Sequence, residues 1–221
     1  MAKYELTKDT IQYDNKTLYR IRAVTDIGNI TAGTYGGFVE SEKNLSHYGR
    51  CWIYPNAYVR GNAFVTENAT VHDTSQVMGN AIISGNARVS GNAIISGQAR
   101  IKDGAFVYGE VRISGNATIT NDAVVGNTAI INGNAHIGQH AVVLSQNEYA
   151  VIEHIGLRAY PVITAYRGYF NNIYIIAGNF NGTIDEFQTL TRKLPCSPKV
   201  KRVYKYMIKS IKASITAYKS E

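Results

Sequence analysis

Residues 85–96 read GNARVSGNAIIS, two consecutive copies of a six-residue unit. The same phase divides residues 55–144 into fifteen hexads without an insertion or a deletion. The fifth position is Val or Ile in all fifteen hexads, and the third is Ala in thirteen, with Ser75 and Val111 as the exceptions. A period this strict indicates one structural unit that is repeated along the chain, so it decides the fold.

Each hexad predicts one short strand followed by a corner. Side chains alternate along a strand, so the third and fifth positions point to the same side, which must be the interior. Gly opens eight hexads and Asn is second in eight, and both residues tolerate left-handed backbone angles, so we interpret them as corner residues. Three hexads make one triangular coil, and coils stacked at about 4.8 Å give each backbone amide a partner in the next coil. The sequence therefore predicts a mainly β protein, a parallel β-solenoid of five regular coils, with a sixth, irregular coil from about Gly37.

Other patterns frame the solenoid at both ends. Residues 4–22 predict a β-hairpin, and residues 26–36 a Gly-rich connection. We interpret this N-terminal part as a cap, because an uncovered solenoid end is an unpaired sheet edge. Residues 162–166 and 173–177 predict a second hairpin, residues 183–193 a short helix with a capping box, and the last segment an amphipathic helix. The domains expected are 1–36 (cap), 37–148 (solenoid), 149–194 (small α+β domain) and 195–221 (connector and helix).

Positive charge gathers at the C-terminal end of the chain. From Leu190 to Glu221 there are nine Lys or Arg and one acid, whereas the preceding residues carry fourteen basic and fifteen acidic side chains. The apolar stripe of the last helix runs from Val200 to Tyr218. Its opposite face holds the predicted partner-binding residues Lys199, Lys201, Arg202, Lys205, Lys209 and Lys212. This face is either the solvated side of a packed helix or a docking surface for nucleic acid or an acidic protein.

The sequence offers few candidate catalytic residues, and the main ones are its five histidines. His72 and His136 should point outward, His140 lies at a corner, and His47 and His154 lie in irregular segments. His72 is the best candidate for a general base, although an ordinary surface histidine explains each of the five.

No metal site, cofactor site or phosphate-binding loop is predicted. Cys51 and Cys196 lie far apart in the sequence and indicate no disulfide framework. The first residues lack the apolar core of a signal peptide, and no apolar run is long enough to span a membrane, so we expect a cytoplasmic protein.

Three stretches carry a resemblance to a known family. Residues 36–46 read GGFVESEKNLS, residues 51–54 read CWIY, and residues 176–187 read IAGNFNGTIDEF. With the Asn-Ala repeats, the chain resembles the YdcK-like hexapeptide-repeat proteins of bacteria, bacteriophages and prophages. The resemblance implies a left-handed parallel β-helix, and these proteins are often labelled as transferases by fold analogy. Asn179 stands where the related pattern has Cys.

Several functions are compatible with this resemblance. Our main hypothesis is a non-catalytic, phage-associated interaction protein, a homo-oligomer such as a trimer, that binds and inhibits a host protein or defence complex in the bacterial cytoplasm. Aromatic and Arg side chains on flat solenoid faces favour such binding. The alternative is a coenzyme A-dependent acyltransferase, which needs a general base, usually His, and a groove for the thioester. Enzymes of that class usually extend a loop from the coils, and the fifteen hexads contain no such loop. A second alternative, ranked after protein binding, is nucleic-acid binding through the basic helix.

Overall fold

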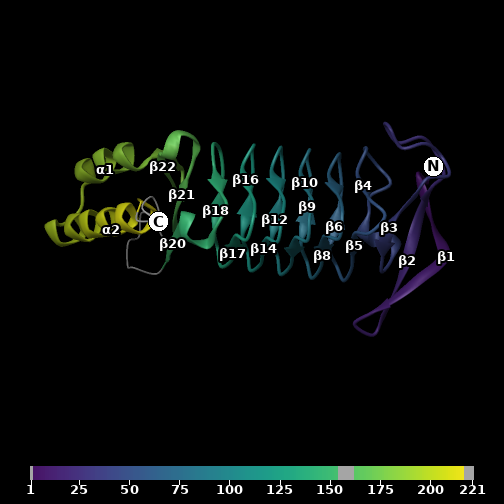
Figure 1. The fold of residues 1–221 in the computed structure, drawn as a ribbon. Coiled ribbons are helices and arrows are strands. Elements are labelled where there is room, and N and C mark those ends of the chain that lie inside the picture. Colours follow the sequence, from purple (N-terminus) through teal and green to yellow (C-terminus); the bar gives the residue numbers. More distant parts are fainter. Residues whose placement is uncertain (1, 154–161, 217–221) are drawn as a thin grey trace.

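The protein is a rod-shaped β-solenoid with a cap at each end. The computed structural model describes residues 2–153 and 162–216 (Figure 1). The solenoid strands form three parallel sheets, which we call faces 1, 2 and 3. Each solenoid strand pairs with the strand one coil further along the chain, as in the pairing of Arg88 with Phe106. The predicted parallel solenoid of about six coils is therefore confirmed.

The strands of each face follow one another along the rod. Face 1 contains β3 (Tyr35–Val39), β5 (Tyr58–Val59), β8 (Gln76–Val77), β11 (Ile94–Ile95), β14 (Arg112–Ile113) and β17 (Ile130–Ile131). Face 2 contains β4 (Trp52–Ile53), β7 (Thr70–Val71), β10 (Arg88–Val89), β13 (Phe106–Val107), β16 (Val124–Val125) and β19 (Val142–Val143). Face 3 contains β6 (Phe64–Val65), β9 (Ile82–Ile83), β12 (Arg100–Ile101), β15 (Thr118–Ile119) and β18 (His136–Ile137).

The repeated apolar positions fill the interior as the hexads predict. Every fifth-position Val or Ile, from Val59 to Val143, is 0% exposed, and the third-position residues are buried beside them. Burying each such β-branched side chain contributes about 1.5–3 kcal/mol before conformational entropy is subtracted. In the short strands of the regular coils, such as β10 and β11, the second residue faces inward and the first faces outward, where it is available for binding.

At each Gly-Asn corner only the first of the two residues has a left-handed backbone conformation. The first residue of thirteen hexads has a positive φ, and eight of these residues are Gly. Our interpretation of the second-position Asn as a left-handed residue was wrong, because no second-position Asn has a positive φ. These Asn side chains instead bond from coil to coil, as Asn62 Nδ2 donates to Asn80 Oδ1 at 3.0 Å.

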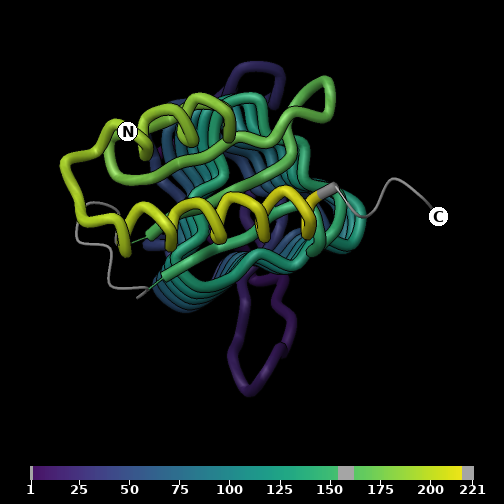
Figure 2. The backbone as a smooth tube through the Cα atoms, turned by 90° about the vertical axis from the view of Figure 1, so that its left-hand side faces the viewer, coloured from purple at the N-terminus to yellow at the C-terminus, as the bar shows by residue number. Residues whose placement is uncertain are grey.

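The N-terminal hairpin continues face 1. β1 (Tyr4–Tyr13) and β2 (Lys16–Ala23) are antiparallel, and Asp14 and Asn15 form the turn with positive φ. β3 pairs with β2 on one side and with β5 on the other, and it runs across position 36, where we had placed a domain boundary. The hairpin projects beyond the outline of the solenoid when the rod is seen end-on (Figure 2).

A sixth coil precedes the regular ones, as expected. A 3-10 turn, η1 (Glu42–Asn44), replaces a strand, and Leu45 forms a bridge with Val65. The buried Asn44 side chain bonds to the next coil in place of backbone groups, because its Nδ2 donates to the carbonyl oxygens of Gly61 at 2.9 Å and Ala63 at 2.8 Å.

The C-terminal cap is an antiparallel sheet covered by two helices. The sheet order is β20-β21-β22-β23. Its elements are η2 (Gln146–Glu148), β20 (Tyr149–Glu153), β21 (Val162–Arg167), η3 (Tyr169–Asn171), β22 (Ile173–Ala177), β23 (Phe180–Thr183), α1 (Ile184–Lys193) and α2 (Pro198–Thr216). Tyr166 belongs to the solenoid core, whereas Ile163 and Ile175 pack with the helices, so the sheet separates the solenoid from α1 and α2. The predicted hairpin and both predicted helices are confirmed, and β20 and β23 were not predicted.

The helices begin and bury their faces as the sequence indicates. Thr183 caps α1, because its Oγ1 accepts a hydrogen bond from the Glu186 backbone N–H and the Glu186 side chain accepts one from the Thr183 N–H. The buried stripe of α2 includes Tyr204, Met207 and Ile211; Tyr218, which we placed on the same stripe, lies outside the described residues. Neither helix of the described chain combines the length and apolar character needed to cross a bilayer.

Candidate functional site

His72 lies at the edge of face 2 and is stacked on an aromatic ring. Tyr54 lies one coil earlier at the same hexad position, so its ring covers the imidazole with centroids 4.0 Å apart and planes inclined by 15°. The side chain points out of the solenoid, as predicted, and is half-buried. The fixed rise of the coils therefore holds the imidazole in one orientation.

His72 is electrostatically biased toward its neutral form. Burial lowers the pKa of His72 below its ordinary value, and the positive charge of Arg88 lowers it further, whereas Asp73 opposes both effects. A neutral imidazole at pH 7 can accept a proton. Geometry and charge together make His72 a possible base.

Replacing Arg88 with Gln is expected to raise the pKa of His72. The substitution removes a nearby positive charge that disfavours the imidazolium ion, while burial remains. The measurement is an NMR titration of the His72 imidazole. Arg100→Gln, an exposed Arg on face 3, is the matched control, and an equal shift in both variants would contradict the local effect of Arg88.

A pocket on face 2 begins beside this stack. Its volume is about 440 Å³. It is lined by Ile27, Gly28, Asn29, Ile30, Arg50, Trp52, Tyr54, Asn68, Thr70 and Asn86. The segment Ile27–Ile30, held as a small loop by backbone bonds of 2.8 and 3.0 Å between its end residues, forms one wall. We call this the face 2 pocket, and Tyr54 joins it to His72.

The lining of the face 2 pocket includes the buried indole of Trp52 and the charged side chain of Arg50. Trp52 is 1% exposed, and its buried Nε1 has no hydrogen-bond acceptor among the described residues. A buried donor without a partner costs about 1–3 kcal/mol. The exposed Arg50 adds a positive charge, and its Cδ lies next to Gly28 of the wall. The charge of Arg50 therefore suits an anionic ligand.

The other histidines have structural surroundings. His47 stacks on Tyr4 at 4.4 Å, and its Nδ1 accepts a hydrogen bond from the Lys3 backbone N–H. His140 occupies the left-handed corner of the last hexad, with φ 65°, and lies against Tyr174. Neither lies at a pocket described for this chain.

His136 lies under the C-terminal cap, and His154 falls outside the described residues. The backbone N–H of His136 donates to Thr164 Oγ1 at 3.0 Å. Burial lowers the pKa of His136, and the charge of Lys102 adds to that effect. Burial and charge therefore favour the neutral form of His136 as well.

The buried thiol of Cys51 is not an activated nucleophile. Cys51 is buried, and burial raises the pKa of its thiol although Lys3 Nζ lies 3.0 Å from Sγ and opposes the shift. Cys196 is half-buried in the connector before α2. Within residues 2–153 and 162–216, no three His, Cys, Asp or Glu side chains gather as metal ligands.

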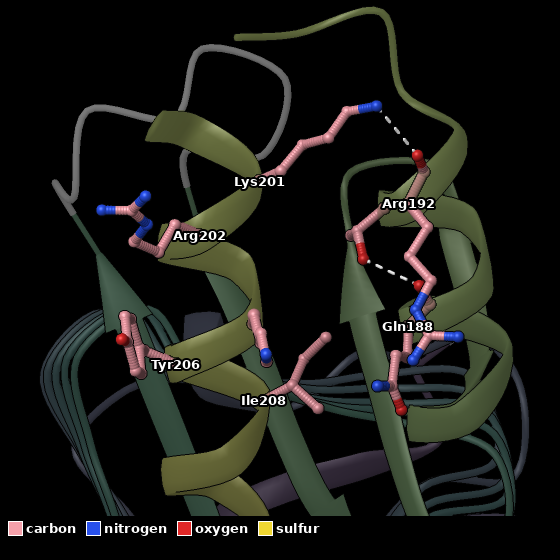
Figure 3. A pocket seen from close by; sticks show the side chains of 8 residues that line it. Gln188, Arg192, Lys201, Arg202, Tyr206 and Ile208 are labelled. Carbon is pink, nitrogen blue, oxygen red and sulfur yellow. Dashed lines mark hydrogen bonds between the residues drawn. The ribbon is translucent and has the colours of Figure 1, made fainter. Parts of the chain in front are cut away.

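The predicted basic residues of the last helix divide into two groups. Lys201, Arg202 and Lys205 line a groove of about 420 Å³ between α1 and α2, together with Gln188, Thr191, Arg192, Tyr206 and Ile208. We call it the basic groove (Figure 3). Lys199 and Lys209 are exposed outside the groove, and Lys212 forms an ion pair with Asp185 at 2.6 Å. Sequence reasoning missed Arg192 and Tyr206, because α1 and α2 meet only in the folded chain.

Sequence reasoning also missed the face 2 pocket. Moving along the chain by one coil from Trp52 reaches Thr70, and the next coil brings Arg88, so the outward column of face 2 was readable from the hexad phase. The wall from Ile27 to Ile30 was not readable, because a Gly-rich connection carries no pattern that states what it covers.

Comparison with known proteins finds similarity to one repeat family in two short segments of the solenoid. Residues 81–97 and 111–127 match the model of the YdcK Beta solenoid repeat. The chain is 38% identical over 72 residues to a protein of Escherichia coli (strain K12) named "Uncharacterized acetyltransferase YdcK". This similarity covers 28% of the chain and 22% of that protein. The chain thus contains a YdcK-type solenoid repeat and has a distant, partial relative that is named an acetyltransferase.

Proposed function

We propose that this protein transfers an acyl group from a thioester such as acetyl-coenzyme A to an amine or hydroxyl acceptor, with His72 as the general base beside the face 2 pocket. The observation that carries the proposal is the imidazole of His72 stacked on the pocket-lining Tyr54, where burial lowers the pKa of His72. The partial similarity to a protein named an acetyltransferase supports the same reaction class.

The face 2 pocket carries a charge that suits the acyl donor. Arg50 offers positive charge for the phosphates of the donor. Acyltransferases of the hexapeptide-repeat class usually extend a loop from their coils to enclose the thioester. Here the coils extend no such loop, and the segment Ile27–Ile30, which precedes the solenoid, forms one wall of the pocket instead.

The reaction balances with His72 as the proton carrier. The nitrogen or oxygen of the acceptor attacks the thioester carbonyl carbon and forms a new bond to it, while His72 takes the proton that the acceptor loses. The carbon–sulfur bond then breaks, and the leaving thiolate receives the proton from the imidazolium ion. The products are the acylated acceptor and a free thiol, and His72 returns to its neutral form.

The phage-associated interaction hypothesis is weaker after these findings. The similarities give no support for phage association or for inhibition of a host factor, whereas the matched relative carries the name of an enzyme. We propose a homo-oligomer, since acyltransferases of the hexapeptide-repeat class have their sites between trimer subunits. Light scattering of the purified protein measures this directly, and a monomeric mass would remove the trimer from the proposal.

Acetyl-coenzyme A is expected to stabilise the protein against heat. A ligand at about 100 times its Kd stabilises the folded state by about 2.7 kcal/mol, which raises Tm by roughly 5–11 °C in a chain of this size. The measurement is a melting curve with and without acetyl-coenzyme A, together with the release of free thiol in the presence of candidate amines. Arg50→Gln should abolish the shift, and Arg112→Gln, an exposed Arg on face 1, should retain it. No shift at millimolar donor would overturn the proposal.

A further inference from the structure

The basic groove carries positive charge that no ion pair among residues 2–153 and 162–216 neutralises. Arg192 of α1 lines it with Lys201, Arg202 and Lys205 of α2, and none of its lining residues is acidic. None of these four cations forms an ion pair with a described residue. Lys201 Nζ donates to the carbonyl oxygen of Arg192 at 3.0 Å, a neutral partner that leaves its charge uncompensated. Gathering like charges in one groove disfavours the free protein and favours an anionic ligand.

The positive surface is elongated. Arg202 lies one turn before Tyr206 on the same side of α2, whereas Lys201 points across to α1 (Figure 3). Lys205 and Lys209 continue this exposed side at the spacing of helical neighbours. From residue 202 to residue 209 the helix rises about 10 Å. A polyanion that lies along α2 can therefore contact successive cations, which a single compact anion cannot do.

An exposed aromatic ring stands among these cations. Tyr206 is 65% exposed, although α2 buries its other large apolar side chains against the C-terminal sheet. Stacking of a base on an aromatic ring next to basic side chains is the usual mode of binding to single strands. An acidic peptide would use the lysines but would have no planar group for Tyr206, and a duplex would present its bases only within the stack.

We propose that the basic groove and the exposed side of α2 bind single-stranded nucleic acid, with Arg192, Lys201, Arg202 and Lys205 on the phosphates and Tyr206 stacked on a base. This activity is separate from acyl transfer, because the groove lies on the C-terminal cap and His72 directly follows β7 of face 2, near the opposite end of the rod (Figure 1). Binding can therefore be tested whether or not the acyltransferase proposal holds.

The experiment measures fluorescence anisotropy of a labelled single-stranded oligodeoxynucleotide of mixed sequence with the full chain. About four phosphate contacts give a slope of log K against log salt near −3, so affinity should fall about 50-fold between 50 and 200 mM salt. The triple variant Lys201→Gln, Arg202→Gln, Lys205→Gln should bind at least about 10-fold more weakly and show a shallower slope. The matched control Lys8→Gln, Lys43→Gln, Arg112→Gln removes the same charge from exposed sites outside the groove and should stay within about 3-fold of the parent protein.

Substitution of Tyr206 separates nucleic acid from other polyanions. Tyr206→Ala should lower oligonucleotide affinity by roughly 5- to 150-fold, the range measured for loss of one stacked base, and Tyr206→Phe should retain it. Binding of inorganic polyphosphate should not change in either variant. Far-ultraviolet circular dichroism checks that each variant is folded.

Three results would overturn the proposal. The first is no binding at 50 mM salt, or equal weakening by the groove and control triples. The second is equal competition for the groove by polyglutamate and by unlabelled oligonucleotide, together with an unchanged oligonucleotide affinity of Tyr206→Ala. This result would assign the groove to an acidic protein. The third is a duplex of the same sequence that binds more tightly than the single strand.

Discussion

His72→Asn is expected to lower kcat for thioester transfer by at least about 100-fold while acetyl-coenzyme A still stabilises the protein. A positioned general base contributes about 10²–10⁴-fold to a rate, and Asn cannot accept the proton. The imidazole lies at the pocket edge and does not line the pocket itself, so binding of the donor should survive. The measurement is thiol release per enzyme at saturating donor, with a melting curve of the variant in parallel.

The pH profile gives a second readout for His72. Protonated His72 is inactive as a base, so kcat/KM should fall as the pH drops through its pKa. Because burial and Arg88 lower that pKa, activity should persist below pH 6.5, the ordinary value for His, and decline only at lower pH. Arg88→Gln should move the decline to higher pH.

A matched control variant distinguishes the base from a general loss of structure. His140→Asn removes another solenoid imidazole, at a left-handed corner that Asn tolerates, and should keep parent kcat. Equal rates for His72→Asn and the parent protein would exclude His72 as the base.

Gly91→Val is expected to destabilise the solenoid by at least about 3 kcal/mol. Gly91 has φ +75°, and a Cβ there would lie 2.6 Å from the backbone nitrogen of Gly109 in the next coil. A β-branched residue is strained at that φ, and the clash lies between backbones that the stacking bonds hold in place. The Gly91 N–H also donates to Asp73 Oδ2 at 2.8 Å, a bond between coils that a shifted corner would lose. The expected Tm loss is about 6–12 °C for a chain of this size.

Gly33→Val is the control for this prediction. Gly33 has φ +89°, but a Cβ there would meet no atom within 4 Å, so the substitution adds backbone strain without a clash. Urea unfolding followed by circular dichroism measures both variants. Equal losses of unfolding free energy would show that strain alone matters and that coil contact at Gly91 does not.

Sequence periodicity predicted the repeating part of the fold because its determinants are local. The side chain of Val89 points inward because side chains alternate along a strand. Its partner in the next coil is Val107, because one coil contains three hexads. The start of α1 was predictable for the same reason, since Thr183 and Glu186 form hydrogen bonds within its first turn.

The sites were not predictable to the same degree, because they depend on contacts between segments that are separated in the sequence. Arg192 and Lys201 line one groove because two helices pack together. Ile27, which precedes the solenoid, lines one pocket with Trp52 of the first coil. The backbone angle of Asn62 was predicted wrongly because two different roles select Asn at this position. Asn tolerates left-handed backbone angles at a corner, and it also bonds to the Asn of the next coil, as Asn62 does to Asn80.

Because every regular coil contains three hexads, the length of the solenoid increases in equal steps of one coil. Each strand of face 2 pairs in register with the next, so a tandem duplication of one coil would add about 4.8 Å and reproduce the contacts on either side of it. The hairpin bonds to early coils, as Tyr13 Oη donates to Gln76 Oε1, and the C-terminal cap bonds to the last coil, as the Tyr169 N–H donates to the His140 carbonyl oxygen, so both would keep these contacts. The separation between the face 2 pocket and the basic groove can therefore change only in whole steps, and chain length within the repeats sets how far apart two bound molecules are held.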